Sequence, residues 1–296
     1  MKEVSFDVEE GRSFSRNDVR NDNNFSLFRD RPFLRISRGK YLPIEGKLVE
    51  ELLFENLFHR VYRACERDGS FFAEFGRAFE GYAQEYVRYF LGRNNHYQII
   101  DEFSYDKGGS KSPDLMIKIP DERAMIVIEV KSARPLDDAL TTNNNKESVE
   151  KTLQKLQSAP WMQSYNSVCN ILKKKGHVEF TADTIYYFLS VTMNNIPFMI
   201  GGFSVKSKGF DLDKFFYSVD IETFELLVRF SSTVKEYSIR DTLLNYNQNR
   251  GRMSMKTYVL KVYKKIHRKM DINSTEYIDM INSDLIYHME LLSLAK

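Results

Sequence analysis

Residues 112–133 read SPDLMIKIPDERAMIVIEVKSA, two apolar segments separated by a four-residue polar insert. Leu115–Ile119 and Met125–Lys131 are rich in Ile, Val, Leu and Met, which is typical of buried strands. The insert, Pro120–Arg123, has the composition of a tight turn. We therefore expect a β-hairpin in which the two strands lie side by side and antiparallel.

Three ionisable residues interrupt this otherwise apolar hairpin. Side chains two residues apart on a strand point to the same face, so Glu129 and Lys131 share a face and Val130 lies on the opposite one. Asp114 stands at the start of the first strand, and in a hairpin the start of one strand lies opposite the end of the other. The sequence therefore predicts that Asp114, Glu129 and Lys131 converge at one end of the hairpin.

Ionisable groups are costly to bury unless they are paired or bind a metal, which leaves two interpretations of this cluster. In the first, the carboxylates of Asp114 and Glu129 and the backbone carbonyl of Val130 supply oxygen ligands to Mg²⁺. Such an ion can activate a water for attack on a phosphodiester, and Lys131 can orient that water and stabilise the developing negative charge. In the second, Asp114 is a turn residue, and Glu129 and Lys131 form a pair at a solvated edge.

Further regular elements are expected on both sides of the hairpin. A helix runs from Phe71 to Leu91 and ends at Gly92, and a strand at 97–100 precedes the hairpin. A polar loop at 141–146 leads into a helix at 148–157, and the run TIYYFLSVT at 184–192 is typical of a buried strand. The order helix, three strands, helix, strand indicates an α/β core with a helical annex.

The residues PD at 113–114 and EVK at 129–131, with fourteen residues between them, resemble the motif of the PD-(D/E)XK nuclease superfamily. The segment at 76–82, of the form G-x-x-F-E-x-Y, is similar to the helix that precedes the first core strand in that family. The resemblance covers about residues 71–192. It implies a restriction-endonuclease-like α-β-β-β-α-β core with a mixed central sheet, and Mg²⁺-dependent cleavage of phosphodiester bonds, usually in DNA, with Mn²⁺ as a substitute ion.

Three further residues are candidates for the site. The family's first helix often carries an additional metal-binding Glu, and Glu80 fits that position; Glu74 and Glu85 compete for it, and each of the three could instead be a solvated helix charge. Gln154, on the helix after the third strand, is a candidate contact to the scissile phosphate, although a polar outer face is the simpler explanation. Lys111, in the turn before the hairpin, is a candidate phosphate contact.

Three segments are expected along the 296 residues. Residues 1–69 comprise an N-terminal flexible lead of about 30 residues and a helical segment that begins near Tyr41. Residues 70–205 form the nuclease-like core, which includes a strand candidate at 198–203. Residues 206–296 form a helical C-terminal region.

The overall charge gives no electrostatic argument for nucleic-acid binding, since 43 Lys and Arg stand against 41 Asp and Glu and the net charge is +2. Any positive surface has to be local. Lys173–Lys175 and the run from Lys256 to Lys269 are candidates, and each could follow a nucleic-acid backbone or be a solvated helix face.

Two further features concern the compartment. Cys65 and Cys169 lie far apart, in no metal-binding spacing, and fit reduced thiols. The N-terminus has no apolar region of a signal peptide, and no apolar run is long enough to cross a bilayer. A cytoplasmic location without membrane association is expected.

The sequence therefore favours a Mg²⁺-dependent phosphodiesterase, a DNA endonuclease of the restriction, defence or repair type, with RNA as the alternative substrate. A double-strand cut needs two active sites, so a homodimer is expected. The competing hypothesis is a catalytically silent nucleic-acid-binding or scaffold module that retains the nuclease fold. Such a protein would have lost one of the three core groups, and none is missing here.

Overall fold

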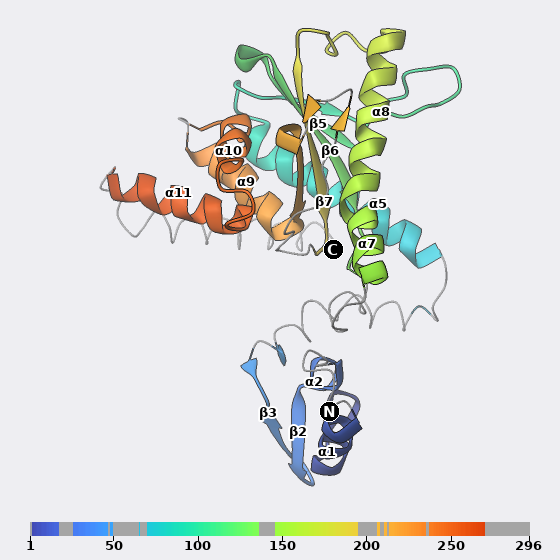
Figure 1. The fold of residues 1–296 in the computed structure, drawn as a ribbon, viewed down its shortest axis with the longest axis vertical. Coiled ribbons are helices and arrows are strands. Elements are labelled where there is room, and N and C mark those ends of the chain that lie inside the picture. The colour runs from blue at the N-terminus through green and yellow to red at the C-terminus, as the bar shows by residue number, and fades with distance from the viewer. Residues whose placement is uncertain are drawn as a thin grey trace. The chain divides into compact units, whose positions relative to one another are not determined.

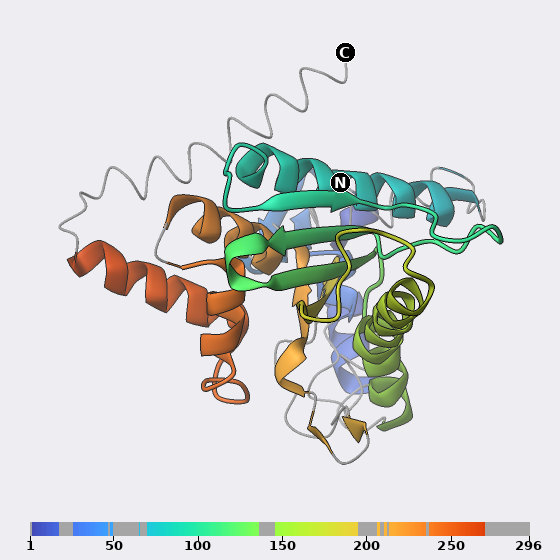
Figure 2. The ribbon, with the colours of Figure 1, turned by 90° about the horizontal axis from the view of Figure 1, so that it is seen from above.

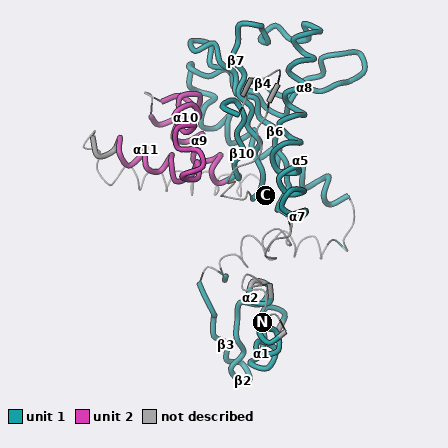
Figure 3. Tube along the Cα trace, in the orientation of Figure 1, with its two compact units in different colours: residues 1–196, 203–221 teal, residues 197–202, 222–296 magenta. Residues whose placement is uncertain are grey.

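The computed structural model shows a mixed α/β protein with a five-stranded mixed sheet and a three-stranded sheet, so the α/β prediction is confirmed. It describes residues 2–17, 26–46, 48–49, 65, 70–135, 146–194, 206–207, 210–211, 213–234 and 237–269. The chain forms two compact units, one of residues 1–196 and 203–221 and the other of residues 197–202 and 222–296 (Figure 3).

The five-stranded sheet belongs to the first unit (Figure 1). Its spatial order is β10-β7-β6-β5-β4, formed by β4 (Gln98–Asp101), β5 (Leu115–Ile119), β6 (Ala124–Lys131), β7 (Ile185–Thr192) and β10 (Phe216–Asp220). β5 is antiparallel to both of its neighbours, whereas β6, β7 and β10 run parallel to one another. β6 is central and is buried along its whole length except at Lys131, as expected for a strand covered on both faces.

The predicted hairpin is present as β5 and β6. Leu115 pairs with Ile128 at one end and Ile119 with Ala124 at the other. A single 3-10 turn, Pro120–Glu122, connects the two strands, and Arg123 closes it in the left-handed conformation with φ of 48°.

Helices cover the two faces of this sheet (Figure 2). α5 (Ser70–Leu91) lies on one face and packs through a buried stripe of Ala83, Tyr86, Val87 and Leu91. On the other face, one π-helical turn at Gln154–Ser158 joins α7 (Lys146–Leu153) to α8 (Ala159–Lys174). Trp161 and Val168 of α8 belong to one buried apolar cluster with Met125 and Val127 of β6. The helix predicted at 148–157 corresponds to α7 and the π turn, and α8 has no counterpart in the sequence prediction.

The N-terminal segment contains more regular structure than the sequence prediction gives it. A three-stranded sheet is formed by β1 (Ser5–Phe6), β2 (Phe33–Ser37) and β3 (Lys40–Pro43), accompanied by α1 (Val8–Asn17) and α2 (Ser26–Asp30). The expected flexible lead is therefore wrong for residues 2–17 and 26–30, where Phe6 and Phe28 pack edge to face with ring centroids 5.4 Å apart. The helix expected from Tyr41 does not begin there, because Tyr41 belongs to β3. Most of that helix, and the strand candidate at 198–203, lie outside the described residues.

We expected residues 206–296 to be helical, but the described part of this region also contains strands. β8 (Lys206–Ser207) pairs with β9 (Phe210–Asp211), and β10 forms an edge of the central sheet. β10 pairs with β7 along all five of its residues, and this pairing stabilises a strand that the sequence pattern did not indicate.

The described part of the region after β10 consists of α9 (Ile221–Thr233), α10 (Ile239–Tyr246) and α11 (Met255–Lys269). Across the described ranges, no helix combines the length and the apolar character that a membrane span requires.

Candidate active site

Three ionisable side chains meet at the end of β6. The pairing of Leu115 with Ile128 places the next two residues, Asp114 and Glu129, opposite each other. The Nζ atom of Lys131 lies 2.7 Å from Oε1 of Glu129 and 3.9 Å from Oδ2 of Asp114. The structure therefore brings together Asp114, Glu129 and Lys131, which we call the acid–lysine cluster.

Asp114 is held in place through both its side chain and its backbone. Its side chain is buried, and Oδ2 accepts a hydrogen bond of 2.8 Å from the backbone N–H of Val130. Its backbone carbonyl accepts a 3.0 Å hydrogen bond from Nε2 of Gln84 on α5. Burial raises the pKa of Asp114, and this effect exceeds the opposing effects of the Lys131 charge and the Val130 hydrogen bond.

Glu129 is the most deeply buried member of the cluster, with 1% of the residue exposed. Its Oε2 accepts a 3.1 Å hydrogen bond from the hydroxyl of Ser164, which α8 places over the strand. Burial, and next the charge of Asp114, raise the pKa of Glu129 to about 7, although Lys131 and Ser164 act in the opposite direction. A carboxyl with this pKa exchanges a proton near neutral pH.

Lys131 lies between the buried acids and the solvent, since about a third of its side chain is exposed. Burial lowers the pKa of Lys131, but the carboxylates of Glu129 and Asp114 more than offset this, so the pKa is raised. The amine is therefore held as an ammonium group beside two acids.

Glu80 is the glutamate of α5 that the cluster affects most directly. It is half-buried, whereas the two competing residues, Glu74 and Glu85, are exposed, and Glu85 pairs with Arg88 at 2.7 Å. Burial, followed by the charge of Asp114, raises the pKa of Glu80. Of the three candidates on this helix, Glu80 is thus the one that can act with the cluster.

Lys111 lies at the edge of the cluster and is already paired. Its Nζ is 2.7 Å from Oε2 of Glu102, and 64% of its side chain is exposed. That hydrogen bond is the main reason why the pKa of Lys111 is raised, and the charges of Asp114 and Glu80 add to it. Glu102 was missed by sequence reasoning, although its place directly after β4 was a signal that could have indicated it.

Gln154 does not contact the cluster. The residue is exposed in the π turn, whereas Gln157 of the same turn is buried. Within the part of the chain that the structure describes, no hydrogen bond joins the side chain of Gln154 to the acid–lysine cluster. Its contact with a phosphate stays a prediction.

Two residues that position the cluster were not predicted from the sequence. Gln84 and Ser164 are ordinary polar residues on helices, and their roles depend on how α5 and α8 are rotated against the sheet. Gln84 lies one turn after Glu80, so the face of α5 that carries the candidate acid is also tied to the start of β5. In the sequence, the one signal for this role of Gln84 was its spacing of one helical turn from Glu80 on the predicted helix.

The cluster suits Mg²⁺ by its donor chemistry. In the described ranges, no three His, Cys, Asp or Glu side chains are gathered so that they alone could hold a metal ion. Mg²⁺, however, commonly takes one or two carboxylates and keeps several waters. Asp114 and Glu129 supply these hard oxygen donors, and burial raises the pKa of each despite the opposing charge of Lys131.

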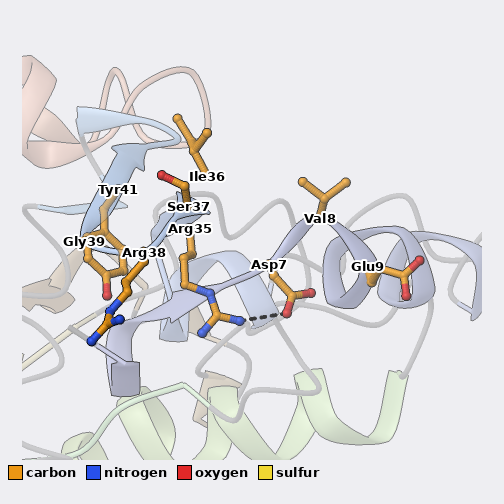
Figure 4. A pocket seen from close by; sticks show the side chains of 9 residues that line it. All are labelled: Asp7, Val8, Glu9, Arg35, Ile36, Ser37, Arg38, Gly39 and Tyr41. Atoms are coloured by element: carbon orange, nitrogen blue, oxygen red, sulfur yellow. Dashed lines mark hydrogen bonds and ion pairs between the residues drawn. The ribbon is translucent and has the colours of Figure 1, made fainter.

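A pocket of about 510 Å³ lies in the N-terminal segment, between the start of α1 and the β2–β3 hairpin. Figure 4 shows the guanidinium of Arg35 turned toward the carboxylate of Asp7, and these groups pair at 2.9 Å. Asp7 also accepts a hydrogen bond from the backbone N–H of Glu10, which is the main reason why its pKa is lowered. Because Asp7 caps α1 and Arg35 pairs with it, these groups have structural roles, and the pocket contains none of the predicted site residues.

Comparisons with protein-family models, with curated proteins and with solved structures found no match to this chain. The feature of the molecule that bears most directly on function is therefore the geometry and electrostatics of the acid–lysine cluster.

Proposed function

We propose that this protein is a Mg²⁺-dependent nuclease of the PD-(D/E)XK type that hydrolyses phosphodiester bonds in DNA. The observation that carries the proposal is the acid–lysine cluster, in which Lys131 lies 2.7 Å from Glu129 and 3.9 Å from Asp114 at the end of a central strand. Two buried carboxylates beside an ammonium group are costly as a purely structural arrangement, and a site that binds a cation and an anionic substrate explains that cost.

The order of elements also supports the proposal. α5, β4, β5, β6, α8 and β7 follow one another as helix, three strands, helix and strand, which is the order that the resemblance to the superfamily implies. The carboxylates come from β6 and from the start of β5, and the additional glutamate comes from the helix before the first strand. The motif residues thus occupy the elements on which the family carries them.

Each residue has a defined role in this mechanism. The carboxylates of Asp114 and Glu129 and the backbone carbonyl of Val130 would hold Mg²⁺, with Glu80 as a further acid. When bound, Mg²⁺ supplies Lewis-acid activation of water and neutralises charge on the phosphodiester. Lys131, as an ammonium group, orients the attacking water and stabilises the negative charge that develops on the phosphate.

Two further residues keep these groups in position. Ser164 donates to Glu129 and so favours the ionised carboxylate, which is the form that binds a cation. Gln84 holds the backbone at Asp114 against α5. Both act through the acids and do not touch the reacting atoms.

The test is a cleavage assay on supercoiled plasmid, single-stranded DNA and single-stranded RNA, with Mg²⁺, Mn²⁺ or EDTA. Wild type should cut DNA with either metal and not in EDTA. Lys131→Met and Glu129→Gln should each lose about 10²-fold or more of the rate. Glu74→Gln, which changes an exposed glutamate on α5, should cut like wild type.

Each contrary outcome has a distinct meaning. Cleavage that persists in EDTA or in Lys131→Met would contradict the metal-nuclease mechanism. A preference for RNA would keep the mechanism and change the substrate. Complete inactivity on all three substrates, with retained binding, would favour the silent nucleic-acid-binding or scaffold module. If the enzyme is a homodimer, linear product should form without prior accumulation of nicked plasmid.

A further inference from the structure

One segment of this chain carries a strong net positive charge. Residues 222–269 contain eleven Lys and Arg and four Asp and Glu, a net charge of +7, although the whole chain has a net charge of +2. The remaining residues are therefore net negative, and the near-neutral total conceals a strongly basic part. Such asymmetry within a chain is typical of a segment that contacts a polyanion.

Three of these basic residues lie on one face of α11, which we call the basic face and define by Lys261, Lys264 and Lys265. These lysines follow one another at helical spacing and are all exposed. The helix contains no Asp or Glu. Among the residues that the structure describes, none of the three lysines forms a hydrogen bond or an ion pair.

The absence of acidic partners on α11 distinguishes this face from an ordinary solvated helix surface. Like charges at i and i+4, as in Lys261 and Lys265, destabilise a helix by a few tenths of a kcal/mol. Surface helices commonly relieve this repulsion with acids on the same helix or on a neighbouring one, as Glu222 of α9 does for Lys256. The basic face has no such relief within α11, and a row of phosphates would supply it.

The opposite face of α11 is already used for packing. Met255, Val259 and Tyr263 are buried, and the ring of Tyr263 contacts that of Phe230 on α9 with centroids 6.1 Å apart. A helix that lies on a membrane inserts its apolar face into the lipid, which α11 cannot do while that face is packed. Charge complementarity without a free apolar face favours a nucleic-acid backbone over a lipid surface.

We propose that the basic face of α11 binds the phosphate backbone of duplex DNA. The inference rests on the proposed function for its choice of polyanion and adds a binding surface remote in sequence from the acid–lysine cluster. Lysines that contact phosphates release condensed counterions, so the affinity depends steeply on salt and is independent of base sequence.

The test measures binding in EDTA, so that it does not require cleavage. A fluorescently labelled DNA duplex is titrated with the full chain at several salt concentrations, and anisotropy gives the affinity. Lys→Gln changes at 261, 264 and 265 are compared with Lys→Gln changes at 40, 107 and 155, which are also exposed lysines but belong to neither basic run. Both triple variants lower the net charge by three, so any difference between them reports location.

The basic-face variant should bind on the order of 100-fold more weakly near 0.15 M salt, and its slope of log K against log salt should be smaller by about 2 to 3. The control variant should stay close to wild type. All six lysines are exposed, and exposed substitutions away from buried features change stability little, so thermal unfolding should be nearly unchanged in both variants.

Three outcomes would overturn the inference: equal losses in the two variants, wild-type affinity in the basic-face variant, or binding of the wild type to anionic phosphatidylserine vesicles but not to DNA. Failure of the proposed function would give a different result from these three, namely binding in EDTA without cleavage in Mg²⁺.

Discussion

Replacing Glu129 by Gln is expected to stabilise the metal-free protein at alkaline pH while it abolishes cleavage. The carboxyl of Glu129 is almost completely buried, and its nearest charged neighbours are one acid and one lysine. Ionising it inside the protein is therefore less favourable than in the unfolded chain. Gln has nearly the same shape and cannot ionise, so the substitution removes this cost and the metal ligand together.

The magnitude follows from the pKa of Glu129, which is raised from 4.5 to about 7. Between these values the folded state binds more protons than the unfolded state, so the free energy of unfolding falls as pH rises through this window. At about 1.4 kcal/mol per pKa unit the full effect is on the order of 3 to 4 kcal/mol, most of which is lost between about pH 5 and pH 8. The variant lacks this dependence, so its stability relative to wild type should rise by that amount.

The assay is urea unfolding in EDTA at both pH values, followed by circular dichroism. Glu74→Gln, an exposed glutamate on α5, is the matched control and should follow wild type at both pH values. Mg²⁺ at about 100 times its dissociation constant should then restore about 2.7 kcal/mol to wild type at alkaline pH, and nothing to Glu129→Gln. Parallel pH dependence of wild type and Glu129→Gln would refute the reasoning, because it would mean that Glu129 is ionised in the fold without a cost.

Three further substitutions test the surroundings of the cluster. Ser164→Ala removes a hydrogen bond to the Glu129 carboxylate, so the pKa of Glu129 should rise further. The acidic limb of the pH–rate profile should then move to higher pH, and kcat/KM near neutral pH should fall about tenfold. Gln84→Ala frees the backbone carbonyl of Asp114 from α5, and urea unfolding should show a loss of about 1 kcal/mol together with slower cleavage. Trp161→Phe leaves the buried carbonyl on β10 that accepts the indole N–H at 2.7 Å without this donor, and thermal unfolding should show destabilisation by about 1 to 3 kcal/mol.

The hairpin and its three ionisable residues could be predicted because they depend only on local geometry. Alternation of side chains places Glu129 and Lys131 on one face, and a short turn fixes which residues of the two strands are opposite. This pairing also fixes the position of Asp114, which lies opposite Glu129. Neither step requires knowledge of the rest of the fold, which is why both could be read from twenty residues.

Other parts depend on contacts between distant segments and could not be predicted in this way. Pro160 suggests that a helix ends before it, but it occupies the first turn of α8, where the missing N–H has no cost. β10 is a strand because β7 offers it an edge. The contacts of Ser164 and Gln84 are set by the rotation of two helices against the sheet, and a single sequence contains no direct signal of that rotation.

Under the proposed function, the charges around the acid–lysine cluster favour separate surfaces for catalysis and for attraction of the substrate. Four carboxylates and two ammonium groups lie within mutual electrostatic influence, namely those of Glu80, Glu102, Asp114, Glu129, Lys111 and Lys131. With all of them ionised, two negative charges remain, and these repel a phosphodiester unless a cation or a proton offsets them. If the protein acts on DNA as proposed, its affinity is then expected to come from another surface, and residues 222–269, with a net charge of +7, are the proposed source. Because the acidic and basic parts nearly cancel, the net charge of +2 hides both.

On this reasoning, removing the divalent ion should abolish cleavage and leave DNA binding largely intact, whereas added salt should weaken binding at any concentration of the metal.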